Sequence, residues 1–276
     1  MAAGGGEPRT GTRRIDTSRP HSARMYDYYL GGKTHYEVDA QAAEAVIAAM
    51  PVARRAARAN RDFMIRATRW LTAEAGVRQF LDIGSGIPTE PNLHQVAQAV
   101  APECRVVYSD NDPIVLQYAQ ALLHSTPEGR TAYVQGDVLE PSTVLGAAEL
   151  RGTLDLDEPV ALTVNALFHF VSDARDPYGI VRELLGVLPR GSYLVLSHAT
   201  SDFTGQEQEK DAENVKETYA KGGSPLSPRN RAEVERFFEG LEMVEPGVVP
   251  PQRWRPEAGL PDSASIPYYA GVARKP

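Results

Sequence analysis

The sequence contains a single cysteine, Cys104, among 276 residues. One thiol cannot form an internal disulfide, and no Cys/His cluster at zinc-ligand spacing surrounds it, so neither a disulfide framework nor a zinc module is expected. Apolar runs are short: none approaches the roughly 18 residues of a membrane span, and residues 1–20 lack the apolar stretch of a signal peptide. We therefore expect a cytoplasmic protein with no membrane partner, whose first 20 residues form a flexible tail.

The sequence has few positively charged residues: it contains 29 Lys and Arg against 36 Asp and Glu, which gives a formal net charge of -7. Such a field repels phosphate backbones, so the composition predicts no nucleic-acid partner and favours a small molecule or a protein. Hydrophobic residues make up 42% of the chain and charged residues 24%, which allows a sizeable core. The sequence carries no signal for an oligomeric state.

Short apolar segments alternate with helix-compatible segments from Gly76 onward. This alternation predicts βαβ units, a parallel sheet and right-handed crossovers. Upstream, Phe63, Ala67 and Leu71 recur on one face of an Ala-rich stretch, which predicts helices. We expect an α/β fold with a helical cap over residues 21–75 and a core over residues 76–276. The predicted strands are 79–83, 105–109, 131–135, 160–164 and 193–197, then two closing strands at 241–249 and 265–273.

Three predicted strands end in residues suited to a nucleotide-like ligand. The first runs into Gly84 to Gly86, where the missing Cβ atoms permit a tight turn and a close approach by a ligand. The second ends at Asp110, and a carboxylate there is the usual partner of a ribose diol. The third leads to Asp137 and Val138, whose carboxylate and N–H match the amino group and ring nitrogen of adenine. Each alone is also explained as a turn residue, but their spacing of roughly 27 residues is close to one βαβ unit.

These motifs carry a resemblance to a known family. Leu81-Asp82-Ile83-Gly84-Ser85-Gly86, an acidic end of the next strand and Gly136-Asp137-Val138 are similar to the motif series of class I S-adenosylmethionine-dependent methyltransferases, over residues 79–199. The segment Arg24-Met25-Tyr26-Asp27-Tyr28-Tyr29-Leu30-Gly31-Gly32-Lys33, with Ala59-Asn60-Arg61 downstream, resembles a bacterial family of uncharacterised S-adenosyl methyltransferases. With Val164-Asn165-Ala166-Leu167-Phe168-His169-Phe170 included, the resemblance spans nearly the whole chain.

The resemblance implies a Rossmann-like doubly wound sheet of seven strands, mostly parallel with the last strand antiparallel. It implies S-adenosyl-L-methionine as cofactor and methyl transfer to an unidentified small-molecule acceptor. The glycine turn would hold the methionine part, Asp110 the ribose, Asp137 with Val138 the adenine, and Asn165 would line the sulfonium side. No catalytic base is established for the family. The expected cofactor-binding residues are Arg24, Tyr26, Arg61, Asp82, Gly84, Ser85, Gly86, Asp110, Asn111, Asp137, Val138 and Asn165.

The segment from Arg24 to Tyr36 is too aromatic for a free tail. A parallel sheet opens its ligand crevice at the carboxyl ends of its strands, where a preceding cap can close it. We expect the segment to form part of the site wall, with Arg24 or Arg61 pairing with the cofactor's carboxylate in a bidentate geometry that lysine cannot reproduce. The alternative is that its tyrosines dock on a remote face of the core.

Two other functions share part of this pattern. An NAD(P)-dependent oxidoreductase also has a glycine turn and an acidic strand end, but its G-x-G-x-x-G/A fingerprint needs a small residue where Thr89 stands. A protein that binds S-adenosylmethionine without transferring a methyl group, as a sensor or degenerate enzyme, fits the same motifs. His169 and His198 follow two strands and are either general bases or packing residues, so we assign no catalytic residue.

The acceptor pocket would be built from the cap and from the insert between Ser201 and Asn230. An acidic helical stretch in this insert is most simply a solvated face, and otherwise a guide to a basic acceptor. Its acidic residues are Glu207, Glu209, Asp211, Glu213 and Glu217. Ser227 followed by Pro228 predicts the start of a helix over 232–238 that ends near Gly240.

Overall fold

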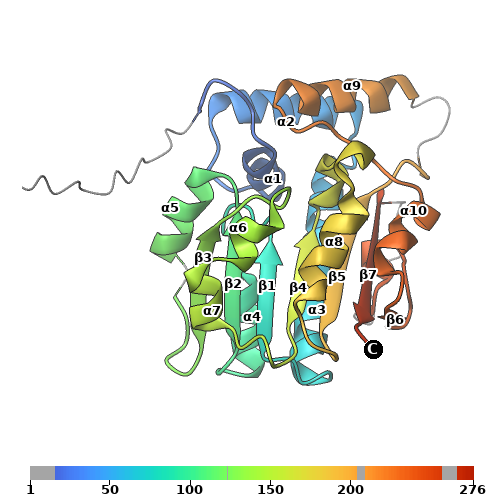
Figure 1. Ribbon diagram of the computed structural model, residues 1–276. Coiled ribbons are helices and arrows are strands. Elements are labelled where there is room, and N and C mark those ends of the chain that lie inside the picture. Colours follow the sequence, from blue (N-terminus) through green and yellow to red (C-terminus); the bar gives the residue numbers. More distant parts are fainter. Residues whose placement is uncertain (1–15, 123, 204–208, 257–265) are drawn as a thin grey trace, which may run out of the picture.

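The computed structural model describes residues 16–122, 124–203, 209–256 and 266–276, which contain one sheet of seven strands (Figure 1). The strands are β1 (Gln79–Ile83), β2 (Arg105–Asp110), β3 (Arg130–Gln135), β4 (Ala161–Asn165), β5 (Tyr193–Ala199), β6 (Glu242–Met243) and β7 (Tyr268–Arg274). Their order is β3-β2-β1-β4-β5-β7-β6. Because β7 runs antiparallel to β5 and β6 whereas the other neighbours pair in parallel, the predicted Rossmann-like doubly wound sheet is confirmed.

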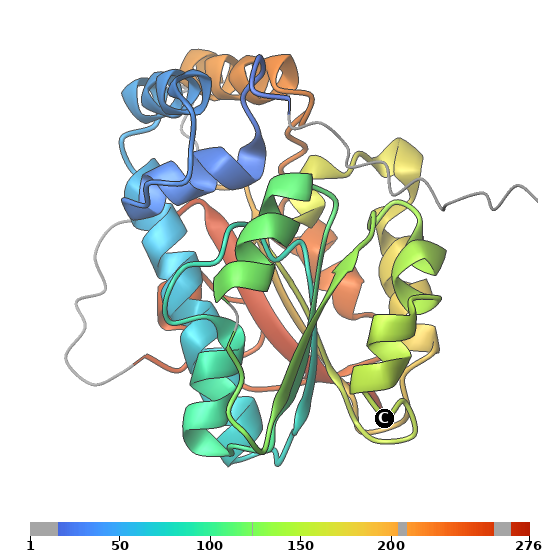
Figure 2. The same ribbon diagram turned by 90° about the vertical axis from the view of Figure 1, so that its left-hand side faces the viewer.

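Helices cover both faces of the sheet (Figure 1 and Figure 2). On one face lie α3 (Ala53–Ala73) and α4 (Leu93–Val100), and α5 (Pro113–Leu122) packs on β2 and β3. On the other face lie α6 (Pro141–Leu145), α7 (Ala148–Thr153), α8 (Pro177–Gly186) and α10 (Arg231–Glu235). The described residues also form short 3-10 turns: η1 (Phe168–Phe170), η2 (Asp173–Arg175), η4 (Arg236–Phe238) and η5 (Pro251–Arg253).

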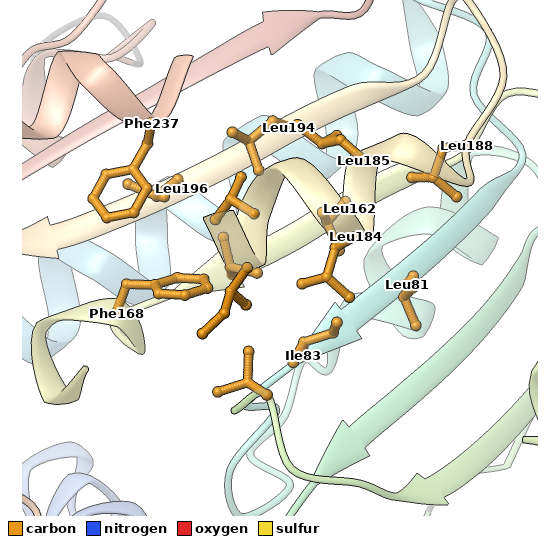
Figure 3. Close-up of a cluster of buried hydrophobic side chains, with 14 of the residues drawn as sticks. Leu81, Ile83, Leu162, Phe168, Leu184, Leu185, Leu188, Leu194, Leu196 and Phe237 are labelled. Carbon is orange, nitrogen blue, oxygen red and sulfur yellow. The ribbon is translucent and has the colours of Figure 1, made fainter. Parts of the chain in front are cut away.

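Each face of the sheet has its own apolar core. Figure 3 shows the cluster under α8, where Leu162, Leu184 and Leu196 are fully buried. On the opposite face Phe63 of α3 packs edge-to-face on Trp254, with ring centroids 5.4 Å apart. Burying a side chain of this size contributes about 1.5 to 3 kcal/mol, so the two clusters fix the strands beneath the site as a rigid floor.

A cap of helices lies above the carboxyl ends of the parallel strands (Figure 1). It consists of α1 (Ser22–Leu30), α2 (Glu37–Ala49), the start of α3 and α9 (Glu209–Lys221), held by a cluster that includes Met25, Val46 and Val215. The cap is not one segment of the chain, because α9 comes from the insert that follows β5. The rest of α3 continues down the face of the sheet, so part of the segment expected in the cap belongs to the core.

The N-terminal residues that the structure describes are bonded to the cap. Of the tail expected over residues 1–20, residues 1–15 lie outside the described part. The carbonyls of Asp16 and Arg19 accept hydrogen bonds from Arg24 of α1 at 3.0 to 3.2 Å. Within the described ranges no helix is both long and apolar enough to cross a membrane.

The five predicted parallel strands are present to within two residues at each end. Two C-terminal predictions need correction. The closing strand predicted over 241–249 shortens to β6, because Pro246 and Gly247, whose φ is +82°, turn the chain away. The last helix begins not at Ser227 but after Asn230, whose side chain accepts from the N–H of Glu233 while Glu233 accepts from that of Asn230. The N–H of Ser227 instead donates to the carbonyl of His169.

Candidate active site

A cavity of about 290 Å³ lies between the cap and the carboxyl ends of β1 to β4. The strand order places β1 beside β4, and the segments that follow these two strands leave in opposite directions. A crevice opens at such a switch point in doubly wound sheets. The volume is near the lower end of the roughly 300 to 1,000 Å³ of ligand pockets, which suits a small ligand rather than a polymer.

Eleven of the twelve residues predicted at the cofactor site line this cavity. They come from α1, from α3, from the carboxyl ends of β1, β2 and β4, and from the loops after β1, β2 and β3. The structure thus brings these eleven residues together around one cavity. The eleven are Tyr26, Arg61, Asp82, Gly84, Ser85, Gly86, Asp110, Asn111, Asp137, Val138 and Asn165.

Arg24 is the residue that the structure does not bring to the cavity. It is 3% exposed, and its Nε lies 3.2 Å from Oδ1 of Asp39. The ring of Tyr36 covers the guanidinium, with 5.3 Å between the guanidinium carbon and the ring centroid. Its charge thus holds α1 to α2, and the expected pairing of Arg24 with a cofactor carboxylate has no support in this arrangement.

The glycine turn after β1 is tied to the end of β2. The N–H of Gly84 donates to the carbonyl of Ser109 at 2.8 Å, and the N–H of Gly86 donates to Oδ2 of Asp110 at 2.8 Å. Gly84 and Gly86 have φ values of +72° and +65°, a region that residues with a Cβ rarely adopt. A Cβ on Gly84 would also lie 2.8 Å from a methyl group of Leu167. The turn therefore requires glycine at both positions.

Asp110 holds the floor of the cavity together while keeping acceptor capacity. Its Oδ1 accepts from the N–H of Asp112 at 3.0 Å and its Oδ2 from that of Gly86, one bond to each oxygen. Since a carboxylate oxygen accepts up to two hydrogen bonds, both remain able to accept from a ligand. Burial raises the pKa of Asp110, and the two N–H donors oppose this rise. His21, which precedes α1, lines the cavity on this side.

Asp137 closes the same edge of the floor one strand further out. Its Oδ1 accepts from the N–H of Leu139 at 2.9 Å, which fixes the turn after β3. A Cβ on the preceding residue, Gly136, would lie 2.5 Å from a methyl group of Val144. The backbone therefore lies close against α6, and Asp137 and Val138 are directed to the cavity rim.

Asp82 and Arg61 supply opposite charges at one side of the floor. Asp82 accepts a hydrogen bond from the hydroxyl of Thr163, and burial raises its pKa to about 6 although Arg61 favours the charged form. Arg61 donates from Nη2 to the carbonyls of Thr89 and Pro91, but its Nε–H is buried with no partner among the described residues. This N–H in the cavity lining is therefore free to donate a hydrogen bond.

The upper half of the cavity is aromatic. Its wall, which we name the aromatic chamber, consists of Tyr26, Tyr29, His169, Phe170, Tyr219 and Tyr268. The hydroxyls of Tyr29 and Tyr219 lie 3.1 Å apart, joining α1 to α9. The ring centroid of Phe170 lies 5.4 Å from that of Tyr219 and 4.3 Å from that of His169. Segments far apart in the sequence thus form one continuous wall.

The chain is similar to proteins of a known family. The model of a family described as S-adenosyl methyltransferase matches residues 8–276. The chain belongs to this family. The fold and membership together identify a methyltransferase, and they disfavour the oxidoreductase alternative. A comparison with curated proteins finds no match.

Solved structures similar to this methyltransferase include a DUF574 family protein from Streptomyces avermitilis, with 55% identity and a TM-score of 0.91, covering 95% of this chain and 100% of that one. A protein from Thermobifida fusca has 37% identity and a TM-score of 0.85 over 97% of this chain and 98% of its own. The plantazolicin methyltransferase BamL, solved with S-adenosylhomocysteine, shares 10% identity, covers 92% of this chain and 95% of that one, and has a TM-score of 0.53, which shows a common fold alone.

The two candidate histidines of the methyltransferase differ in position. His169 lines the cavity, and its Nδ1 accepts from the N–H of Ala199 at 3.3 Å, so the neutral ring carries its hydrogen on Nε2. Burial lowers its pKa well below the ordinary value. His198 does not line the cavity: its Nε2 accepts from Arg229 at 2.8 Å, and burial lowers its pKa to about 3. Both histidines are neutral at pH 7, and His198 serves packing.

A chain of hydrogen bonds fastens the cap of the methyltransferase to the sheet. Asn60 donates to the hydroxyl of Tyr26 at 2.9 Å and accepts from the hydroxyl of Ser197, which in turn accepts from the N–H of Ala166 at 2.9 Å. Ala166 has a φ of +53°, uncommon for a residue other than glycine. The preceding residue, Asn165, lines the cavity, and its Oδ1 is buried without a partner among the described residues.

Among the lining residues that sequence reasoning did not single out, three carry rings. His21 precedes the tyrosine-rich segment, whereas Tyr219 and Tyr268 lie in the insert and in the last strand. No local pattern marks Tyr219 or Tyr268, because a single tyrosine on a helix or strand is ordinary. The useful signal was the tyrosine-rich segment itself, whose Tyr26 and Tyr29 indicated an aromatic surface in need of a partner.

Proposed function

We propose that this methyltransferase binds S-adenosyl-L-methionine on the floor of the cavity and transfers its methyl group to a small molecule held in the aromatic chamber. The observation that carries the proposal is the convergence of Arg61, Asp82, Asp110 and Asp137 on one cavity at the switch point of the sheet. Each of these side chains has hydrogen-bonding capacity that its protein contacts leave open.

The floor fits the cofactor part by part. The unpaired Nε–H of Arg61 and the carboxylate of Asp82 are complementary to the carboxylate and ammonium groups of an amino acid. Asp110 would accept from the ribose hydroxyls, and Asp137 with the N–H of Val138 would bind the adenine. Gly84 and Gly86 would let the ligand approach the backbone closely, with Ser85 and Asn111 beside them.

The chain's own contribution to the reaction is positioning and the exclusion of water. When bound, the cofactor supplies a methyl group activated by a sulfonium. The protein has to hold a nucleophile in line with that methyl group, which accounts for much of the rate gained by such enzymes. Tyr29 of α1 and Tyr219 of α9 meet over the chamber and form its roof. This enclosure favours a small acceptor over a protein or a nucleic acid.

The proposal is tested by ligand-dependent stabilisation. S-Adenosylmethionine and S-adenosylhomocysteine at about one hundred times their Kd should stabilise the fold by about 2.7 kcal/mol. For a chain of this size that corresponds to a rise in Tm of roughly 5 to 10 °C. Differential scanning fluorimetry measures it, with NAD and NADP as controls that should leave Tm unchanged. A shift with NAD alone would contradict the proposal.

A further inference from the structure

Charge in the cavity is confined to its floor. The charged or acidic lining residues are Arg61, Asp82, Asp110 and Asp137, with His21 beside them. The upper half, by contrast, is lined by the aromatic chamber together with Met50, Ala53, Ala56, Ala57 and Val171. None of these described side chains carries a charge at neutral pH. The cavity therefore has a polar half and an uncharged half.

The ionisable groups of the chamber are held neutral by their surroundings. Burial raises the pKa of Tyr26, Tyr29, Tyr219 and Tyr268, and burial lowers that of His169. The charges of Arg61 and Arg229 act on Tyr26 and His169 from beside the chamber, but no side chain that lines the chamber offers a direct counter-ion. A charged ligand group placed there would lose its water without contacting one. Burying an unpaired charge in this way costs several kcal/mol or more.

The acidic face of α9 does not alter this conclusion. Asp211, Glu213 and Glu217 are exposed, while α9 presents Tyr219 to the cavity. Glu207 lies outside the described residues, and the side chain of Glu209 is likewise not described. The described acidic side chains of α9 therefore form a solvated face, and a basic acceptor gains no counter-ion from them.

One polar atom near the boundary between the two halves lacks a partner. Asn165 pairs with Ser197 across the sheet, and Ser197 is linked through Asn60 to Tyr26 of the chamber. The buried Oδ1 of Asn165 has no hydrogen-bond donor among the described residues. Because buried polar atoms are usually paired, this oxygen is a candidate acceptor for an O–H or N–H of a bound molecule.

We propose that the methyl acceptor is an uncharged aromatic compound whose ring packs in the aromatic chamber and whose hydroxyl or amino hydrogen is donated to Oδ1 of Asn165. This inference rests on the proposed function for the position of the methyl donor. Aromatic rings pack favourably edge-to-face or offset, with about 0.5 to 1.5 kcal/mol per pair beyond simple burial. The tyrosine and phenylalanine rings of the chamber offer several such contacts.

The test uses one ring with different charges. The full-length protein is saturated with S-adenosylhomocysteine, and 2-naphthol, 2-naphthoate and 2-naphthylmethylammonium are titrated into it by calorimetry. Neutral 2-naphthol should bind at least about tenfold more tightly than either charged compound, a difference of about 1.4 kcal/mol. Tighter binding of the anion or the cation overturns the inference, and so does the absence of binding by all three.

The role of Asn165 is tested with the methyl ether of the same compound. 2-Methoxynaphthalene has no O–H to donate, so it should bind several-fold more weakly than 2-naphthol to the parent protein. In Asn165→Val the two compounds should bind equally. Equal binding to the parent protein removes Asn165 from the recognition of the acceptor.

Matched tyrosine variants separate this inference from the proposed function. Tyr219→Ala should weaken 2-naphthol binding at least about fivefold and leave the affinity for S-adenosylhomocysteine unchanged. Tyr118→Ala, at a tyrosine that is 39% exposed on α5, should change neither affinity. If S-adenosylhomocysteine fails to bind the parent protein, the proposed function is wrong. If it binds but the charged compounds are preferred, only the acceptor class is wrong.

Discussion

Asp82 is a carboxyl group in a place where its charged form is costly. Burial raises its pKa to about 6, and neither the hydroxyl of Thr163 nor the charge of Arg61 offsets this rise. The nearby carboxylate of Asp110 adds to it. Perturbed pKa values of this kind gather at functional sites, where binding a ligand repays the cost of the charge. We therefore expect Asp82 to lower the stability of the free protein.

Asp82→Asn should raise stability at neutral pH. Between about pH 4 and pH 6 the folded protein keeps a proton on Asp82 that the unfolded chain has lost, so the free energy of unfolding falls as pH rises through this window. The variant lacks this fall and should be more stable at pH 7 by on the order of 1 to 3 kcal/mol, with no difference near pH 4. Urea unfolding at both pH values measures the effect. A variant less stable than the parent at pH 7 would show that Asp82 is stabilised by its contacts.

The two aspartates of the floor should act on different parts of one ligand. Asp110→Ala and Asp137→Ala should each weaken S-adenosylhomocysteine binding by about 1 to 3 kcal/mol, because each removes a hydrogen-bond acceptor. Adenosine, which lacks the amino-acid part, should lose affinity for both variants. Calorimetry measures this, with the exposed Asp157→Ala as control. Unchanged affinity in both variants would leave these aspartates as turn residues.

Helices α1 and α3 are joined to the end of β5 by the bonds between Ser197, Asn60 and Tyr26. Asn60→Ala and Tyr26→Phe remove the same bond from its two ends, so their effects on the free energy of unfolding should not add. We expect a coupling of about 0.5 to 3 kcal/mol in a double-mutant cycle measured by urea unfolding.

Thr72→Val provides the control for this cycle. Thr72 is buried on the same helix, three turns beyond Asn60 and roughly 18 Å along the axis, and its hydroxyl donates to the carbonyl of Thr68. Its effect should add to that of Tyr26→Phe within about 0.5 kcal/mol. Additive effects for the Asn60 pair as well would show that the chain of bonds does not link cap to sheet.

Strands and cap were predictable to different extents, for a physical reason. A buried parallel strand has a local signature, a short apolar run such as Phe80 to Ile83 that leads to a turn, and the structure bears it out. The start of α10 was misplaced because Ser227 and Pro228 match a common helix start, whereas the capping box of Asn230 and Glu233 forms the actual one. Both sites match a helix start locally. The backbone N–H groups of Ser227 and Arg229 bond to His169 and Ala199 instead, so the helix begins after Asn230.

The floor and the roof of the cavity were likewise predictable to different extents. Its floor comes largely from one stretch of chain, residues 82–138, in which each motif follows a strand, and sequence reasoning found it. Its roof draws Tyr29, Tyr219 and Tyr268 from α1, α9 and β7, and such contacts depend on how the chain folds back on itself. Arg24 illustrates the converse. Its place beside the tyrosines suggested a ligand contact, but its guanidinium is paired with the carboxylate of Asp39.

The contact between Tyr29 and Tyr219 spans 190 residues of sequence. At a synthesis rate of about 5 to 20 residues per second, α1 is made roughly 10 to 40 seconds before α9. During that interval the apolar cluster of the cap lacks Val215. The residues of the cavity floor are therefore made while the aromatic chamber still lacks Tyr219 and Tyr268. The chamber is thus completed only late in translation, and a product that ends before α9 lacks part of its wall.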